Sequence, residues 1–220
     1  MAIDEWLLKQ HLSGHPPSLR FYTWSPSAIS LGYHQRKYPD DWQNLTWKGE
    51  VIDLVRRPTG GRAVLHDGEL TYAVVSSGFS GSRMEGYKKI CEFLIQGWRN
   101  LGIELHYGTA GRGYINNPNC FGTATGADLV TVNGNKLIGS AQLRRGNAIL
   151  QHGSMRLKPD AELFKKVFGE EYFDKVAIAE DLTIETIIAF LIDAAKDCFG
   201  VEFEQRALSD SEWEQILEFN

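Results

Sequence analysis

The hydrophobic positions of the chain recur at two spacings, and the longer spacing predicts helices near both ends and in the middle. Apolar residues every three to four positions over 2–12 predict a first helix, which Pro16 and Pro17 would end. The same spacing over 85–100 predicts a central helix that stops at Gly102. The C-terminal third is expected to be mostly helical, over 161–168, 184–199 and 210–219.

Runs rich in β-branched and aromatic residues predict strands between these helices. They cover residues 19–24, 28–32, 51–56, 63–66, 70–76, 103–106, 129–132, 136–143 and 148–156. Dipeptides such as Asn133-Gly134 supply hairpin turns. We therefore expect an α+β fold with a mixed, largely antiparallel sheet flanked by helices. One domain would span residues 1–220, with a helical part from about residue 160.

Composition narrows the class of protein. Of the 220 residues, 43% are hydrophobic and 23% charged, which is ordinary for a globular domain. No apolar run approaches the ~20 residues of a membrane span, and an acidic N-terminus is unlike a secretory signal, so we expect a cytoplasmic protein. A net charge of −5 disfavours nucleic-acid binding. Three distant cysteines without a C-x-x-C spacing predict neither a disulfide framework nor a metal site.

An irregular segment over 108–126 carries a cysteine that no helix or strand face would bury. The segment, GTAGRGYINNPNCFGTATG, is too rich in Gly, Asn, Thr and Pro for regular structure, and long loops of this kind are usually functional or disordered. Cys91 and Cys198 lie in helical patterns and are expected in the core. Cys120 is either incidental or a nucleophile, and a nucleophile needs a depressed pKa or a nearby base.

Lys136 is a candidate partner for such a thiol. It follows an Asn-Gly turn and precedes small residues, so its ammonium could stabilise a thiolate or polarise an acyl carbonyl. The alternative is a solvated lysine at a strand start, which contributes little packing. On either interpretation we expect replacement of Lys136 to leave the fold intact.

Glycine turns, histidines and arginines supply weaker signals. The Gly60-Gly61 turn is either a plain hairpin or a place where backbone N–H groups approach a carbonyl or phosphate. His66 and His152 end strand-like segments and could be ordinary loop histidines. Two basic clusters either lie in solvent or receive a phosphate or an acidic partner: Arg56, Arg57 and Arg62 in one, Arg144 and Arg145 in the other.

Two long motifs together resemble a known family. They are VRRPTGGRAVLHDGELTY and NGNKLIGSAQLRRGNAILQHGS, and the segments FYTWSPSAISLGYHQ and MAIDEWLL add to them. The chain over 1–157 is similar to the lipoate–protein ligase and octanoyltransferase family, related to the catalytic domain of biotin–protein ligase. Members attach, or help to attach, octanoyl or lipoyl groups to a lysine of lipoyl domains.

The resemblance implies roles for individual residues. Lys136 matches the lysine that contacts the acyl carbonyl. Five residues match the arginine–glycine loop that lines the acyl and nucleotide or thioester site: Arg57, Gly60, Gly61, Arg62 and His66. Three match the pocket wall made by the small-residue strand and the HG turn: Gly139, Ala141 and His152. The pair Cys120-Phe121, followed by Asp128 and the NGNK turn, resembles the cysteine branch, in which the cysteine carries the acyl group as a thioester.

Three functions remain open on this resemblance. The first is a cofactor-independent octanoyltransferase, with acyl carrier protein as donor and a lipoyl domain or glycine cleavage H protein as acceptor. The second is a ligase that uses ATP and Mg²⁺, with Cys120 a bystander. The third is a non-catalytic acyl-binding homologue.

Two departures from the family pattern bear on that choice. The strand that precedes the first helix in many relatives has no counterpart here, which leaves open whether the N-terminus is complete. Roughly 60 residues follow the HG turn, too few for the accessory domain of ATP-dependent ligases.

Overall fold

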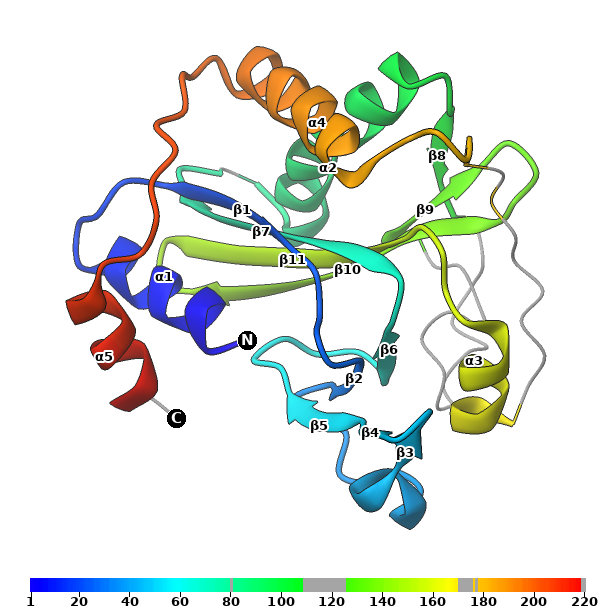
Figure 1. Cartoon of the computed structure of the whole chain (residues 1–220). Helices are drawn as coiled ribbons and strands as arrows, with labels where there is room; N and C mark the ends of the chain where they lie inside the picture. Colours follow the sequence, from blue (N-terminus) through cyan, green and yellow to red (C-terminus); the bar gives the residue numbers. More distant parts are fainter. Residues whose placement is uncertain (80, 109–125, 170–175, 177, 219–220) are drawn as a thin grey trace.

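The computed structural model describes residues 1–79, 81–108, 126–169, 176 and 178–218 (Figure 1). Its largest element is a six-stranded sheet in which every neighbouring pair is antiparallel. In spatial order its strands are β1 (Ser18–Tyr22), β7 (Glu69–Ser77), β11 (Ala148–Arg156), β10 (Lys136–Arg145), β9 (Asp128–Thr131) and β8 (Leu105–Tyr107).

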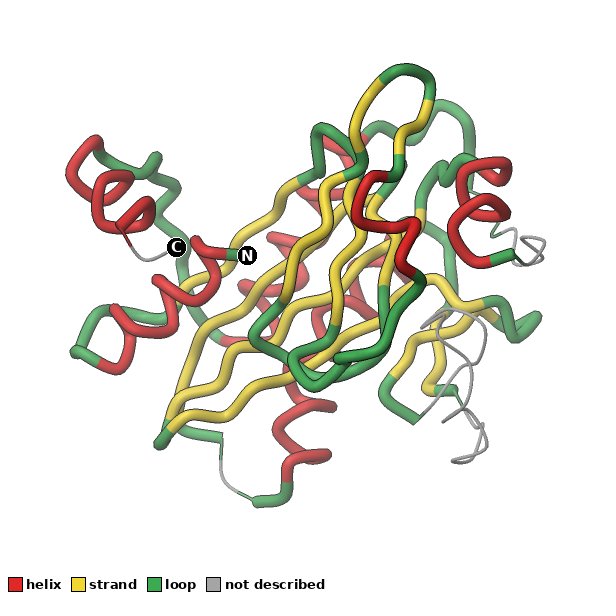
Figure 2. Tube along the Cα trace, turned by 90° about the horizontal axis from the view of Figure 1, so that it is seen from below, coloured by secondary structure: helices red, strands yellow, loops and turns green. Residues whose placement is uncertain are grey.

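A smaller sheet lies against one face of the large one (Figures 1 and 2). Its middle strand β2 (Ala28–Leu31) pairs in parallel with β5 (Asp53–Arg56) and antiparallel with β6 (Val64–His66). A short ribbon of β3 (Thr46–Trp47) and β4 (Glu50–Val51), a 3-10 turn η1 (Asp40–Asn44) and helix α3 (Ala161–Phe168) complete this part. It has a core of its own, centred on Ile29, Trp42 and Leu163.

Helices cover both faces of the large sheet. On one face α2 (Arg83–Asn100) and α4 (Ile184–Phe199) pack together and bury the main core. On the other face α1 (Ala2–Leu12) packs on β7 and β11, and α5 (Asp210–Glu218) packs on α1 (Figure 1). Because both faces are covered, every residue of β11 is buried. None of the helices in the described ranges is both long and apolar enough to cross a membrane.

The expected α+β class with a largely antiparallel sheet is confirmed, and several bounds agree with those expected. The helices over 2–12, 161–168 and 184–199 and the strand over 148–156 begin and end as predicted. The strand expected over 51–56 was wrong in one respect, because Ile52 interrupts it and leaves β4 and β5. The strands also divide into separate sheets, since the period of a strand does not tell which strands will pair.

The central helix begins two residues earlier than its hydrophobic spacing indicates. Ser82 accepts a hydrogen bond from the Glu85 backbone N–H, and the Glu85 carboxylate accepts one from the Ser82 N–H. This reciprocal capping box satisfies two backbone donors that a helix start leaves free, so the first turn forms ahead of the apolar residues.

Candidate active site

A pocket lies between one face of the large sheet and the loop of the small sheet that contains Gly60 and Gly61. This face is called the pocket-facing side of the sheet. From the large sheet it is lined by Thr71, Gly139, Ser140, Ala141, His152, Gly153 and Ser154. From the small sheet and its loop it is lined by Ser30, Arg57, Gly60, Gly61, Val64 and His66, and Met1, which precedes α1, also lines it. The pocket thus gathers residues that lie more than 100 positions apart in the chain.

Strand alternation explains which side chains reach the pocket. His152 pairs with Ala141 on one neighbour and with Ala73 on the other, so these three share a face. Gly139 and Ser154 pair two positions further along and lie on the same face. Gly153 points the other way, and a Cβ there would lie 2.5 Å from Ser140 Oγ and 2.7 Å from the Gly139 carbonyl oxygen. Only glycine fits after His152.

A β-bulge in β10 places Lys136 on the pocket-facing side of the sheet. Strict alternation from Gly139 would point residue 136 toward the main core. The register with β9 shifts between Lys136 and Ile138, so that Lys136 pairs with Val130 while Gly139 pairs with Asp128. Leu137 and Ile138 then both enter the main core. One extra residue has therefore turned the lysine to the other face.

Lys136 is buried in an ion pair. It is 1% exposed, and its Nζ lies 2.9 Å from Asp128 Oδ1, which is itself buried. The expectation of a solvated strand-start lysine was therefore wrong. The expectation that its removal would spare the fold stays a prediction, and the burial of this ion pair argues against it. A carboxylate that loses its partner inside a protein destabilises the folded state. Lys136 is not among the residues that line the pocket, but its partner Asp128 pairs with Gly139, which does line it.

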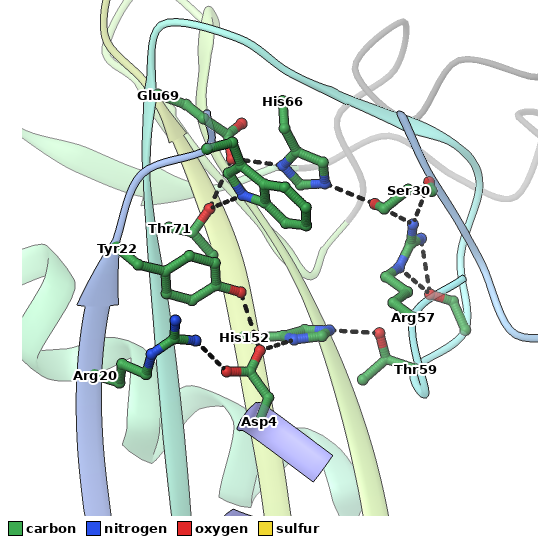
Figure 3. A network of polar contacts seen from close by, with 12 residues as sticks. Asp4, Arg20, Tyr22, Ser30, Arg57, Thr59, His66, Glu69, Thr71 and His152 are labelled. Atoms are coloured by element: carbon green, nitrogen blue, oxygen red, sulfur yellow. Dashed lines mark hydrogen bonds and ion pairs between the residues drawn. The ribbon is translucent and has the colours of Figure 1, made fainter. Parts of the chain in front are cut away.

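A buried chain of polar groups runs from α1 to the glycine turn (Figure 3). Asp4 Oδ2 lies 3.2 Å from His152 Nδ1, and His152 Nε2 lies 2.7 Å from Thr59 Oγ1. Asp4 also accepts hydrogen bonds from Arg20 and Tyr22, at 2.8 and 3.0 Å. A carboxylate only accepts, so His152 carries its proton on Nδ1, and its Nε2 accepts the Thr59 hydroxyl proton.

The charges in this chain follow from its burial. Burial lowers the pKa of His152, although the Asp4 carboxylate opposes that effect. Burial alone would raise the pKa of Asp4, but the hydrogen bond from His152 and the charge of Arg20 together bring it below its ordinary value. At neutral pH the chain therefore contains an ionised Asp4 and a neutral His152.

A second chain reaches the same loop from the other side (Figure 3). His66 Nδ1 lies 2.6 Å from Glu69 Oε1, and His66 Nε2 lies 2.7 Å from Ser30 Oγ. Thr71 and Ser154 donate to the Glu69 carboxylate as well. The indole ring of Trp24 stacks on the His66 ring, with centroids 4.2 Å apart. His66 is therefore held on three sides.

The Arg57 guanidinium holds the glycine turn from within. Its Nη1 donates to the carbonyl and hydroxyl oxygens of Ser30, at 2.9 and 3.1 Å. Its Nη2 donates to the carbonyls of Gly60 and Arg62, at 3.0 and 2.7 Å. Arg57 is 5% exposed. Its planar guanidinium presents several N–H donors in fixed directions, so these hydrogen bonds fix the positions of the loop carbonyls around it.

The family of the chain follows from its sequence as a whole. The model of the lipoyl protein ligase A/B catalytic domain matches residues 1–194. The chain belongs to this family. The octanoyltransferase LipM of Carboxydothermus hydrogenoformans is 43% identical over 173 residues, which are 76% of this chain and 63% of that protein. The octanoyltransferase LipM of Lysinibacillus sphaericus is 34% identical over 98% of this chain and 88% of its own length.

Solved structures share the fold of this lipoyl ligase family member. Protein Ta0514 of T. acidophilum with bound lipoic acid has a TM-score of 0.79 at 25% identity, over 99% of this chain and 87% of that one. Lipoate-protein ligase A bound with ATP also has a TM-score of 0.79 at 25% identity, over 99% and 86%. The predicted resemblance to this family is thereby confirmed.

Within this family fold, the predicted site residues divide into three groups. Seven line the pocket: Arg57, Gly60, Gly61, His66, Gly139, Ala141 and His152. Lys136 lies beside it, and Arg62 contributes its carbonyl to Arg57. Cys120 and Phe121 lie outside the described residues. The chain leaves the described part at Gly108 and returns at Gly126, beside Asp128, whose carbonyl accepts from the Gly108 N–H at 2.9 Å.

Arginines of both clusters donate to the protein's own loops, and the expected role of the clusters as receivers of a phosphate or an acidic carrier stays a prediction. Arg56 Nη1 donates to three backbone carbonyls, of Gly32, Tyr33 and Gln35. Arg144 donates to Gln142 and to the Ser82 carbonyl. Together with Arg57, these arginines hold the protein's own loops. Arg145 is exposed.

The structure adds site residues that sequence reasoning missed. They are Asp4, Arg20, Tyr22, Ser30, Thr59, Glu69 and Thr71. Asp4 is fully buried while Leu12, counted on the apolar side of the same helix, is 40% exposed. The signal that could have found Asp4 is its position among Ile3, Trp6 and Leu7, where a solvated carboxylate is out of place.

Proposed function

We propose that this protein is an octanoyltransferase that moves an octanoyl group from acyl carrier protein to a lysine of a lipoyl domain or of glycine cleavage H protein. The observation that carries the proposal is the 43% identity to the octanoyltransferase LipM of C. hydrogenoformans, against 25% to lipoate-protein ligase A. The matched part of that relative is 63% of its length, so substrates and partners are part of the proposal.

The proposed reaction has two transfers. The Cys120 thiolate attacks the octanoyl thioester of the carrier, the bond from the acyl carbon to the carrier sulfur breaks, and the carrier leaves as a thiolate that takes a proton from water. The amine of the acceptor lysine then attacks the Cys120 thioester, an amide forms, the amine gives up its proton and the Cys120 thiolate is released. Two easier thioester steps replace one difficult step, and neither requires ATP, a metal or another cofactor.

The residues beside the pocket suit this reaction. The Lys136 ammonium, which Asp128 holds at 2.9 Å, would stabilise the oxyanion that forms in both steps. A pre-formed ion pair fixes the ammonium before the substrate arrives, so little reorganisation is left for the reaction itself. Gly139 has no side chain and Ala141 has only a methyl group, so space is left for the acyl group against the sheet.

Intact-mass measurement after mixing with octanoyl–acyl carrier protein, without ATP, tests the proposal. We expect one octanoyl group on the protein, which neutral hydroxylamine releases and which Cys120→Ser does not acquire. Cys198→Ser is the matched control, because Cys198 lies in α4 against the main core, and it should acquire the group normally. A Cys120→Ala protein that octanoylates a lipoyl domain at the normal rate would remove the thioester step.

The second candidate is an ATP-dependent lipoate ligase, which the structure of lipoate-protein ligase A bound with ATP favours. In that case free octanoate or lipoate with Mg²⁺ and ATP would modify a lipoyl domain and release pyrophosphate. We expect no such product. A folded protein that is silent in both assays would instead match a non-catalytic acyl-binding homologue.

A further inference from the structure

One charged side chain of helix α1, that of Asp4, lies buried against His152 of the pocket. Asp4 is fully buried, and three groups donate to it: Arg20, Tyr22 and His152. An ionised carboxylate without such donors would be expelled from the interior or neutralised. A helix could bury an apolar residue at this position at lower cost, so the carboxylate indicates a task that requires its acceptor oxygens.

The hydrogen bonds that begin at Asp4 end at Thr59, at the start of the glycine turn. Asp4 orients His152, and His152 accepts the hydroxyl proton of Thr59, which is 1% exposed. The Thr59 carbonyl accepts the Tyr33 N–H at 2.9 Å. The residue that begins the glycine turn is thus fixed through both its side chain and its backbone.

The fixed turn presents backbone donors beside the pocket. The Gly60 carbonyl accepts from Arg57, and the Gly61 carbonyl is directed at Gly32, where a Cβ would lie 1.8 Å from it. With these carbonyls facing the protein, the N–H groups of Gly60 and Gly61 make no hydrogen bond within the described ranges. Two amides of successive residues can bind one oxygen that carries negative charge.

We propose that Asp4 is a positioning residue, which acts through His152 and Thr59 to hold the Gly60–Gly61 turn with its two amide N–H groups toward the acyl carbonyl. The identity of the acyl group rests on the proposed function. The positioning of the turn by Asp4 does not rest on the proposed function, because it follows from the hydrogen bonds of Asp4, His152 and Thr59.

Asp4→Asn is the sharpest perturbation because it changes no volume. Both carboxylate oxygens of Asp4 accept hydrogen bonds, Oδ1 from Arg20 and Oδ2 from Tyr22 and His152. An amide has one acceptor oxygen, and the Arg20 guanidinium can only donate, so the oxygen turns to Arg20. The NH₂ group then faces His152 Nδ1, which must accept. The proton moves to Nε2, which then donates to Thr59 Oγ1, so this hydrogen bond reverses its direction and the buried Thr59 hydroxyl proton loses its acceptor.

The experiment compares wild type with Asp4→Asn, Thr59→Val and Thr59→Ser. Nitrogen-15 spectra, assigned with His152→Gln, should show the proton on Nδ1 of His152 in the wild type and on Nε2 in Asp4→Asn. The order parameters of the Gly60 and Gly61 amides should fall from about 0.85 to below about 0.6 in Asp4→Asn and Thr59→Val. For octanoyl transfer, kcat should fall about 10- to 100-fold, while KM changes less than about threefold. Thr59→Ser should recover most of both losses.

Asp160→Asn is the matched control, since it is the same chemical change in a residue that caps α3 and pairs with Lys48. It should leave the His152 proton, the two glycine amides and kcat unchanged. The double variant Asp4→Asn/Thr59→Val should be no slower than the slower single variant, because both act through one chain.

The outcomes separate this proposal from the proposed function. A wild-type His152 protonated on Nε2, or rigid Gly60 and Gly61 amides in both Asp4→Asn and Thr59→Val, would overturn it whatever the activity. If Asp4→Asn does not fold, Thr59→Val decides. A wild type that octanoyl–acyl carrier protein does not acylate would refute the proposed function, while the spectra still test the positioning chain.

Discussion

The buried Lys136–Asp128 pair makes a quantitative prediction about stability and activity together. Removal of the ammonium by Lys136→Met leaves the Asp128 carboxylate buried without its ion-pair partner, 2.9 Å away in the native protein. Breaking one partner of a buried pair typically costs about 3–5 kcal/mol. A domain of ordinary stability has only about 5–15 kcal/mol in total, so the loss should be obvious in a urea unfolding curve at pH 7.

The second variant separates stability from chemistry. In Lys136→Met/Asp128→Asn both charges are gone, and most of the lost stability should return, to within about 2 kcal/mol of wild type. Acyl transfer should stay about 10²–10³-fold below wild type in both variants, because the group that stabilises the oxyanion is absent from each. Poor activity in a stable protein would then be a loss of chemistry and not of fold.

Lys48→Met is the matched control for this pair. The Lys48–Asp160 contact has almost the same length, 2.8 Å, but the lysine side chain is 71% exposed. Water screens such a pair, so its removal should leave the unfolding curve unchanged. A Lys136→Met variant that unfolds within about 1 kcal/mol of wild type, or a double variant as unstable as the single one, would refute the predicted cost of breaking this pair.

Three further predictions test the pocket and its surroundings. Burial lowers the pKa of His152, so below the ordinary histidine pKa of about 6.5 the unfolded state binds one proton more than the folded state, and the free energy of unfolding should fall by up to about 1.4 kcal/mol per pH unit. His152→Gln should flatten this slope between pH 5 and 7, and an unchanged slope would contradict a neutral His152 in the folded protein. A Cβ at Gly60 would have no atom within 4 Å, so Gly60→Ala should fold normally, whereas Gly32→Ala would place a Cβ 1.8 Å from the Gly61 carbonyl oxygen and should lower the thermal midpoint. Both variants should slow acyl transfer, and equal thermal midpoints would show that the turn rearranges at little cost. Burial raises the pKa of Cys91 to about 12, so iodoacetamide should modify this thiol only after unfolding, which peptide mapping with and without urea would reveal.

Local patterns were sufficient for most of the secondary structure. The helical spacing over 2–12, 161–168 and 184–199 predicted bounds that the structure repeats, because amphipathic spacing and end signals are properties of consecutive residues. The same is true of the motifs that indicated the family: they are contiguous, and the family model confirms them. The loop residues Gly60 and Gly61 could be singled out in this way, since glycine pairs mark turns wherever they occur.

The contents of the site were decided by contacts between distant segments. Residue parity along β10 points Lys136 at the main core, and only its register with β9 contains the bulge that turns it over. The partner of Asp4 is decided by the packing of α1 on β11, which places this carboxylate against His152, 148 positions away. The sequence alone does not show that Arg57 donates to backbone carbonyls, because Ser30 and Arg62, which accept from it, come together only in the folded chain. A sequence specifies periodicity and turn chemistry locally, whereas the charge, burial and partner of a polar side chain depend on what the rest of the chain brings to it.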